Sequence, residues 1–454
     1  MALTKERIAA ALKNYEDPLD GESEKAQAGR IGEAEGWETV EPDPHDAPWP
    51  LMASGAFHGL AGEIVRHNDP TTEADPNAVL LTTLVYFGSA CNRNPHVMVG
   101  DDRHGTNLNA IIVAESSKGR KGTSQAGPRR LLRIADEAWA TNCVRGGTST
   151  GEGVLWQIRD PIQKPGKDGV LECVDQGVDD KRLTLLESEF SQILKVAQRS
   201  GNTITETIRR LYDSDHLVEI ITKANPARAT DPHVSILGHI TGQELRRSLT
   251  ETDTANGFAN RFLYCSARRS KYLPNPVRMT DAEAGELGRR LTAALIFARR
   301  SSDIRRDRQA EDLWAEIYRD LEQDPGGLAG AITARSAAMT IRLSLIYALL
   351  DSSSAIRREH LEAALAVWEF SEASVRYIFG DLTGDAVADR IIALLKATDH
   401  LTQTEISDAL GRNQPAARIT NALDLLHRSG RIVAKRVRQQ SGPVRPVTRF
   451  EIAR

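Results

Sequence analysis

The sequence predicts an α/β protein with a largely parallel β-sheet covered by helices, followed by an all-helical segment and a small C-terminal domain. Three observations predict this. Short apolar runs, typical of buried strands, alternate with helical patterns between residues 96 and 249. The pattern from 281 to 379 is helical throughout, and 385–454 combines three helices with a basic hairpin. Aromatic residues make up only 5% of the chain, which favours this class over an all-β sandwich or barrel.

Composition restricts the class of protein further. The chain has 454 residues, 26% of them charged and 40% hydrophobic, with a formal net charge of -4. At roughly 100 to 200 residues per domain, we expect two or three domains. No apolar stretch approaches the roughly 20 residues of a membrane-spanning helix, and the N-terminal sequence has no apolar signal core. We therefore expect a cytoplasmic protein without a membrane segment, whose scattered cysteines are reduced thiols: Cys91, Cys143, Cys173 and Cys265.

Charge is unevenly distributed along the chain. Residues 1–75 carry 16 acidic and 6 basic side chains, whereas 385–454 carry 12 basic and 7 acidic ones. The basic end is where nucleic acid is expected. The first 55 residues are too polar to bury a core of their own. Four parts are predicted: 1–55, an acidic and largely extended segment; 56–277, a helical collar and the sheet core; 278–380, a helical lid; and 385–454, a winged helix.

The elements follow from periodicity in chain order. Helical apolar spacing at 56–67 and 77–91 predicts the collar. Strands are then expected at 96–99, 107–114, 182–187 and 233–240, with a helix at 125–140 and further helices between the later strands. In the last part, Thr402 is expected to cap the second helix, and Gly411 and Gly430 mark the turns.

A turn rich in Gly, Lys and Ser follows the buried strand 107–114 and precedes a helix. In this setting backbone N–H groups cradle phosphates. The sequence of 117–124 is SKGRKGTS, which departs from G-x-x-x-x-G-K-[ST], because Arg120 replaces the usual Gly and Thr123 comes one residue late. The alternative is a basic surface loop. The predicted nucleotide-binding residues here are Ser117, Lys118, Gly119, Arg120, Lys121, Gly122, Thr123 and Ser124.

Carboxylates lie at the end of the predicted strand 182–187. Glu187 and Glu189 would face the same way if the strand continued to residue 189. Ligands bind at the carboxyl ends of parallel strands, where Mg²⁺ needs oxygen ligands and hydrolysis needs a group that orients water. The alternative is a strand that leaves the core through solvated glutamates. Strand 233–240 brings Thr241 or His239 to the same edge, either as a γ-phosphate sensor or, for Thr241, as a helix cap.

Five runs together resemble a known family: 117–124, 146–153 (GGTSTGEG), 187–190 (ESEF), 238–241 (GHIT) and 256–263 (NGFANRFL). They are similar to the P-loop proteins of phages, plasmids and integrated elements that are often encoded near primase-polymerases and regarded as replicative helicases. The resemblance covers about 75–380. It implies an α/β P-loop NTPase core with an AAA+/RecA-like parallel sheet, ATP and Mg²⁺ as cofactors, and DNA and a primase-polymerase as partners. Run 146–153 is then either a loop facing a ring channel or a turn.

A second resemblance concerns the motor type. Residues 260–263 (NRFL) are similar to the arginine-finger segment of minichromosome maintenance helicases, and 334–348 followed by 360–365 resembles their helical lid. This implies a hexameric ring in which Arg261 acts on the neighbour's nucleotide and Arg335 or Arg342 contacts nucleotide as a second sensor. Ser188 stands where that class has its magnesium-linked aspartate. The alternatives are an internal salt bridge for Arg261 and a solvated helix stripe for Arg335 and Arg342.

The C-terminal segment has the pattern of a winged helix-turn-helix. Arg, Asn and Gln on a recognition helix suit base edges, and basic wing residues suit phosphates. The predicted DNA contacts are Arg412, Gln414, Arg418, Lys435, Arg436 and Arg438. Docking of a protein is the alternative use of such a module.

These observations predict an ATP-hydrolysing, ring-forming DNA helicase or translocase acting in replication of a mobile element. Lys121 would neutralise the β- and γ-phosphates, Thr123 or Ser124 would ligate Mg²⁺, Glu187 would lie near the metal and Glu189 would orient water. The alternatives are a nucleotide-gated initiator or loader that binds DNA without unwinding it, and a defence-associated ATPase.

Overall fold

The structure is a computed structural model that describes residues 48–453 apart from 116–120, 166, 168–169, 214, 221–226, 250, 324–325, 381, 384 and 438–446. The described chain forms two compact units. The larger unit comprises 49–324 and 331–378, and the smaller comprises 325–330 and 379–454. The smaller unit contains the segment that was predicted to be a winged helix, and it includes a small antiparallel sheet.

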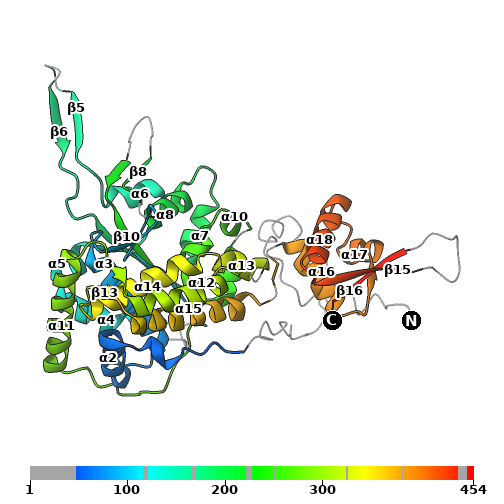
Figure 1. Cartoon of the computed structure of the whole chain (residues 1–454). Coiled ribbons are helices and arrows are strands. Elements are labelled where there is room, and N and C mark those ends of the chain that lie inside the picture. Colours follow the sequence, from blue (N-terminus) through cyan, green and yellow to red (C-terminus); the bar gives the residue numbers. More distant parts are fainter. Residues whose placement is uncertain are drawn as a thin grey trace. The chain divides into compact units, whose positions relative to one another are not determined.

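A five-stranded parallel sheet forms the centre of the larger unit (Figure 1). Strands β3 and β10 are buried at every residue, as expected for interior strands of a parallel sheet. The α/β class and the strands predicted at 107–114, 182–187 and 233–240 are therefore confirmed. The order across the sheet is β11 (Leu263–Ser266), β3 (Asn109–Val113), β10 (His233–Ile240), β7 (Arg182–Glu187) and β4 (Val144–Arg145).

Helix α3 (Pro76–Cys91) is an interior helix, which corrects the prediction of a collar. Asp75 caps it by accepting a hydrogen bond from Asn77 N at 2.9 Å, and Pro76 occupies the first turn, where no N–H is needed. Every residue from Ala78 to Cys91 is buried. A helix that is apolar all round belongs in a core, and α3 contacts β3, β7 and β10.

The helix predicted at 125–140 is broken in two, α4 (Ala126–Ala135) and α5 (Glu137–Asn142). Asp136 lies at the break, where its carboxylate accepts from Trp139 N at 2.9 Å and pairs with Arg182 at 2.7 Å and with Arg299. Burial raises the pKa of Asp136, but the N–H of Trp139 and the two guanidinium groups together hold it below its usual range. The caps and ion pairs of this aspartate outweigh continuation of the helix.

The helical pattern of 281–379 is confirmed, but these helices do not form a compact unit of their own. Leu291 and Leu343 belong to the same hydrophobic cluster as Ala110 of the sheet. The N–H groups of Tyr264 and Ser266 on edge strand β11 donate to Ser371 and Ser374, so a helix covers this edge. The helices are α11 (Asp281–Arg300), α12 (Arg308–Leu321), α13 (Gly327–Thr333), α14 (Ser336–Leu350) and α15 (Arg358–Phe379).

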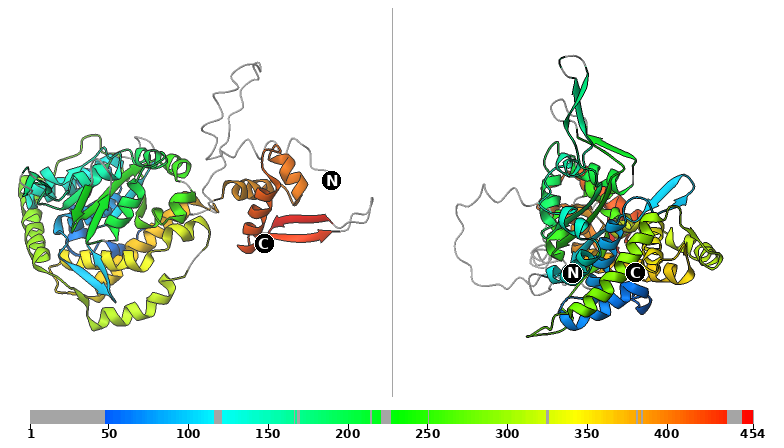
Figure 2. Two further views of the ribbon diagram at one scale, coloured as in Figure 1. Left: turned by 90° about the horizontal axis from the view of Figure 1, so that it is seen from above. Right: turned by 90° about the vertical axis from the view of Figure 1, so that its left-hand side faces the viewer.

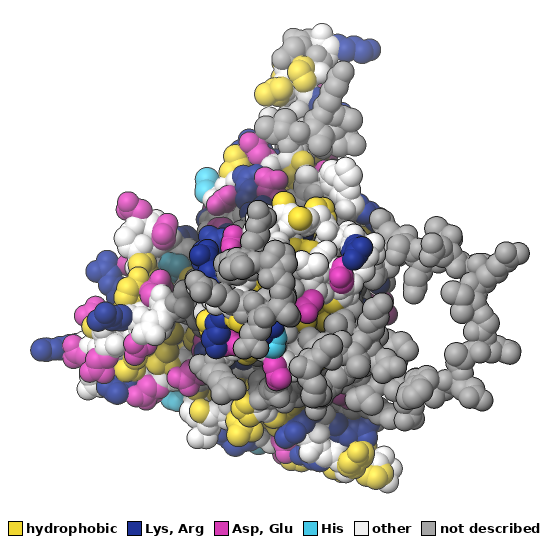
Figure 3. All heavy atoms as spheres, turned by 90° about the vertical axis from the view of Figure 1, so that its right-hand side faces the viewer, with side chains coloured by type: hydrophobic (Ala, Val, Ile, Leu, Met, Phe, Trp, Pro, Cys, Tyr) yellow, Lys and Arg dark blue, Asp and Glu magenta, His cyan; other side chains and the backbone are white. Residues whose placement is uncertain are grey.

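Smaller elements complete the larger unit, and helices lie on both faces of the sheet (Figure 2). The predicted strand 96–99 pairs in a separate hairpin and not in the main sheet. Hairpin β5–β6 projects from the unit and carries exposed apolar side chains, Val170, Leu171 and Val174 (Figure 3). The bounds are α2 (Gly59–Asn68), β1 (His96–Val99), β2 (Asp102–Gly105), α6 (Gly151–Trp156), β5 (Ile162–Pro165), β6 (Leu171–Asp175), α7 (Ser191–Ala197), α8 (Ile204–Tyr212), β8 (Leu217–Ile220), β9 (Ala227–Thr230), α9 (Gly242–Ser248), α10 (Glu251–Ala255), β12 (Arg305–Arg306) and β13 (Ala355–Ile356), with short 3₁₀ turns at η2 (Ser54–Ala56), η3 (Asp69–Thr71), η5 (Lys121–Gln125) and η6 (Ala259–Arg261).

The smaller unit has the predicted order of three helices and a hairpin. Its own apolar cluster includes Ile391, Ile406, Leu423 and Ile432. Thr402 caps the second helix in a capping box with Glu405, as predicted. The elements are α16 (Ala386–Lys396), β14 (Leu401–Thr402), α17 (Gln403–Ala409), α18 (Ala416–Arg428), β15 (Ile432–Val437) and β16 (Val447–Ile452), with the strands in the order β14-β16-β15.

None of the helices in the described part of the chain has the length and apolar character needed to cross a membrane.

Candidate functional site

The carboxyl ends of the central strands bring three predicted segments to one edge of the sheet. Gly238 of β10 aligns with Glu187 of β7, and Ala114 N donates to Ile240 O at 3.2 Å. Ala114 after β3, Glu187 at the end of β7 and Thr241 after β10 therefore share this edge, as the prediction required.

Part of the predicted phosphate turn falls outside the described residues, namely Ser117, Lys118, Gly119 and Arg120. Lys121 is described only through its backbone, as the first residue of η5. The 3₁₀ turn η5 leads directly into α4, so the chain passes from a buried strand through the turn to a helix N-terminus. Within η5, Thr123 is exposed and Ser124 is buried.

Glu187 is buried, at 6% exposure, and its carboxylate binds the backbone of the glycine-rich run 146–153. Its two oxygens accept from Gly147 N at 3.3 Å and from Thr148 N at 3.0 Å. Gly147 has a φ of 80°, a conformation that favours glycine. The second half of the run is a helix, α6, so it is neither a simple turn nor an open loop throughout. The first half instead holds one of the two candidate carboxylates.

Glu189 differs from Glu187 in its surroundings, because the strand ends at Glu187. The condition under which the two carboxylates would share one strand face, a strand that continues to residue 189, is therefore not met. Glu189 is exposed and accepts a hydrogen bond from Gln192 Nε2 at 2.9 Å. Of the two, Glu189 is the one that solvent reaches.

Thr241 caps helix α9, which is the alternative to its role as a sensor. Its hydroxyl accepts from Glu244 N at 3.2 Å and donates to Glu244 Oε2 at 2.8 Å. His239, the other candidate, is buried in β10 at 1% exposure. The hydroxyl of Thr241 is thus already bonded within its own helix cap.

The predicted arginines gather near the amino ends of the strands, on the side of the sheet opposite to the carboxyl ends. Arg342 is buried at 2% exposure and donates to Asn107 O at 2.8 Å, just before β3, and to Tyr212 O at 2.8 Å. The five residues of β3, roughly 16 Å at 3.3 Å per residue, separate this position from the phosphate turn. Arg342 is therefore a core residue that lies at the end of the strands opposite to the predicted phosphate turn.

Arg261 forms the internal salt bridge that was its alternative role. Arg261 is only 6% exposed. Its guanidinium pairs with Asp213 Oδ2 at 2.5 Å and donates a hydrogen bond to the carbonyl of Gly257. Arg335 shares the same aspartate at 3.1 Å and keeps a third of its side chain exposed. As an arginine finger, Arg261 would first have to leave Asp213.

A cavity of about 540 Å³ adjoins the phosphate turn, and sequence reasoning did not find it. Thr123 and Gly127 contribute from the turn and α4. The other walls come from the end of α2 with η3, and from 273–279 after the last strand. Nothing in the spacing of residues 68 and 279 signals that they meet. Its lining includes Asn68, Thr72, Glu73, Arg130, Leu273 and Met279.

A second cavity, of about 500 Å³, lies on α4 and is lined by four arginines and no acidic residue. Among the described residues, no carboxylate pairs with Arg129, Arg133 or Arg145, whereas Arg130 pairs with Asp281 at 2.5 Å. Arg145, one of the arginines that line this cavity, directly precedes the glycine-rich run 146–153 in the chain. The chemistry of this arginine groove suits a polyanion such as a phosphate backbone.

The predicted DNA-binding residues of the smaller unit have different partners. Arg412 pairs with Asp408 at 2.6 Å on an exposed turn, and Lys435 pairs with Glu451. Arg418 pairs with Asp385 at 2.5 Å, which caps α16, so this arginine ties two helices together. Gln414 is half-buried and Arg436 exposed, while Arg438 lies outside the described residues.

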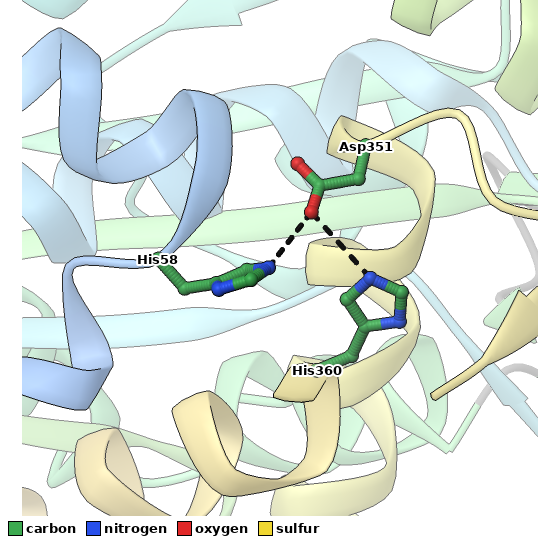
Figure 4. Close-up of side chains that lie close together, drawn as sticks. All are labelled: His58, Asp351 and His360. Atoms are coloured by element: carbon green, nitrogen blue, oxygen red, sulfur yellow. Dashed lines mark hydrogen bonds and ion pairs between the residues drawn. The ribbon is translucent and has the colours of Figure 1, made fainter. Parts of the chain in front are cut away.

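A third candidate centre joins His58, Asp351 and His360, which come from three separate segments (Figure 4). Asp351 Oδ2 lies 2.8 Å from His58 Nε2 and 3.5 Å from His360 Nε2. Two imidazoles and a carboxylate are a ligand set for Zn²⁺ or Fe²⁺. However, His360 Nδ1 accepts a hydrogen bond from Arg357 N at 2.9 Å, so its Nε2 carries the proton and donates to Asp351. This tautomer fits a hydrogen-bonded clasp and not a metal ligand.

Comparison with protein-family models finds no match for this chain, and comparison with curated proteins finds none either.

Proposed function

We propose that the larger unit binds a nucleoside triphosphate with Mg²⁺ at the carboxyl edge of its sheet and hydrolyses it to drive a DNA helicase or translocase of a mobile element. The observation that carries the proposal is that buried strand β3 is followed in the chain by the Gly-, Lys- and Ser-rich segment 117–124, whose described part η5 leads into α4, and that the carboxylates following β7 lie at the same edge of the sheet. Backbone N–H groups at such a helix entrance favour phosphates.

The sheet supports the P-loop assignment. Numbered in chain order, its five strands run 5-1-4-3-2, with the strand that leads into the turn in the interior. This agrees with the AAA+/RecA-like core that the resemblance implies, as an argument from analogy of fold. The roles follow from position: Lys121 neutralises β- and γ-phosphate charge, and Thr123 or Ser124 ligates Mg²⁺.

Hydrolysis forms a bond from a water oxygen to the γ-phosphorus and breaks the bond to the bridging oxygen, which releases the diphosphate and phosphate. Glu189, exposed at the edge, is the residue that can orient this water. Glu187 holds the amides of Gly147 and Thr148, so it shapes the edge and links it to the glycine-rich run. Two basic surfaces support contact with DNA: the arginine groove on α4 and the hairpin of the winged helix.

The test is steady-state ATPase activity with and without single-stranded and duplex DNA, alongside light scattering for the hexameric ring. We expect DNA-stimulated turnover that falls at least a hundredfold in Lys121→Ala and Glu189→Gln. Arg261→Ala should keep nucleotide binding and lose turnover if it acts across a ring. Absence of turnover in the wild-type protein at every DNA concentration would reject the motor.

Two observations favour a second function, a nucleotide-gated initiator or loader. Arg261 is buried and paired with Asp213, and the described hydroxyl of Thr241 is engaged in its cap. If Arg261 is the arginine finger and Thr241 the sensor, these internal contacts would make hydrolysis of the nucleotide slow. Tight nucleotide binding with DNA affinity that depends on nucleotide, and without stimulated hydrolysis, would identify the switch.

A further inference from the structure

The cavity beside the phosphate turn has the size and position of a site for the remainder of a nucleotide. Its volume of about 540 Å³ lies within the roughly 300 to 1,000 Å³ typical of small-molecule pockets. Thr123 belongs both to η5 and to the cavity lining. A ligand whose phosphates lie at the N-terminus of α4 would therefore extend directly into the cavity.

Asn68, the last residue of α2, lines the cavity, and its side chain is the feature that indicates a bound ligand. It is only 3% exposed, yet its Nδ2 has no hydrogen-bond partner among the described residues. A buried polar group without a partner destabilises the folded state, so such groups are rare unless something binds them. The oxygen of the same carboxamide lies 3.4 Å from Thr71 Oγ1.

The phosphate-turn helix packs directly against this carboxamide. A Cβ atom added at Gly127 of α4 would lie 1.9 Å from Asn68 Oδ1, so the glycine is what allows the close approach. Asn68 is thereby held in place between α4 and η3. A side chain fixed in this way can read hydrogen-bond acceptors with little loss of conformational entropy.

We propose that this cavity is the subsite for the base and ribose of the nucleotide, and that Asn68 Nδ2 donates a hydrogen bond to an acceptor atom of that nucleoside. The inference rests on the proposed function, because it assigns the part of the ligand that the phosphate turn does not hold. It makes Asn68 a specificity-determining residue. Inorganic triphosphate, which lacks the nucleoside, should gain nothing from it.

The test compares equilibrium binding of Mg-ATP and of Mg-triphosphate to the full chain. Asn68→Asp keeps the shape and the Oδ1 acceptor but removes the donor, and Asn68→Leu removes it without adding charge. We expect each to weaken ATP binding about tenfold and to leave triphosphate binding unchanged. Asn142→Ala, at an exposed position on α5, is the matched control and should bind both ligands like the wild-type protein.

The outcomes separate this inference from the proposed function. If the wild-type protein binds triphosphate and ATP equally well, or the Asn68 variants bind ATP normally, the subsite is rejected while the phosphate site stands. If the wild-type protein binds neither ATP nor triphosphate, the nucleoside subsite and the proposed function are both rejected. Photolabelling of the wild-type protein with azido-ATP needs no variant: the label should enter residues 68–73 or 273–279 and be displaced by ATP, and labelling elsewhere would overturn the assignment.

Discussion

At the scale of single residues, two glutamates two positions apart have opposite environments. Glu187 is buried and accepts from Gly147 N and Thr148 N, whereas Glu189 is exposed. Glu187→Gln places an NH₂ against one of these N–H groups, which then lacks an acceptor. We expect a loss of about 1–3 kcal/mol in the free energy of unfolding, measured with urea.

Glu189→Gln is the matched control for stability. At an exposed position with one hydrogen bond to Gln192, it should change the free energy of unfolding by less than about 0.5 kcal/mol. Equal effects of the two substitutions would contradict the described environments.

Asp389 gives the smaller unit a pH-dependent stability. Burial raises its pKa to about 6, against hydrogen bonds from Thr383 N and Oγ1, both at 2.6 Å, that lower it. An unfolded aspartate titrates near about 3.9. The folded unit therefore holds a proton that the unfolded chain has lost, so this stabilisation is complete below about pH 4 and disappears as the pH rises through 6.

The measurement is urea unfolding of wild type and Asp389→Asn from pH 4 to 7. Wild type should lose about 3 kcal/mol more than the variant across this range, because two pKa units correspond to about that energy. Asp424→Asn, at an exposed position of α18, is the control substitution, and its free energy of unfolding should show the same dependence on pH as that of the wild-type protein. Parallel pH curves for wild type and Asp389→Asn would be evidence against the raised pKa.

At the scale of elements, caps decide where helices begin and break. Thr241, Thr280 and Thr402 each form a capping box with a glutamate three residues later. Sequence reasoning predicted the cap at Thr402 and named it as one of two roles for Thr241. It did not predict the break at Asp136, because that break depends on Arg182 and Arg299, which are distant in sequence.

Substitution of Thr241 separates a cap from a sensor. Thr241→Ser keeps the hydroxyl and should leave stability unchanged, whereas Thr241→Ala should cost about 1 kcal/mol in urea unfolding. A cap-only role further requires that Thr241→Ala retain ATP turnover below its unfolding transition. If Thr241→Ala loses ATP turnover while its free energy of unfolding is unchanged, Thr241 acts as a sensor.

At the scale of the whole molecule, the smaller unit has a hydrophobic cluster of its own, separate from the cluster that joins α3, α14 and the sheet in the larger unit. The cluster of the smaller unit is built only from residues between Val387 and Ile452. The fragment 379–454 should therefore fold alone and unfold cooperatively, which circular dichroism measures on heating. A gradual, featureless transition would show that it needs the rest of the chain.

The same fragment tests the predicted role of this segment as a DNA-binding winged helix. If it binds duplex DNA, the affinity should fall linearly on a logarithmic scale with salt, and Arg436→Ala should reduce the slope by about one phosphate contact. Arg418→Ala, which breaks a pair with Asp385, should instead lower stability. DNA binding that ignores salt, or none at all, favours docking of a protein.

The sequence by itself determined the α/β class, the central strands, the run of helices and the C-terminal order of three helices and a hairpin, because each depends on periodicity within a few neighbouring residues. It also predicted that the residue after β3 and the glutamate that ends β7 lie at one edge of the sheet, since parallel strands end together. Only the tertiary structure decided which side chains meet. Arg261 with Asp213, Arg342 with Asn107, and the cavity that joins Asn68 to residues 273–279 all link segments far apart in the chain, and no local pattern encodes such contacts.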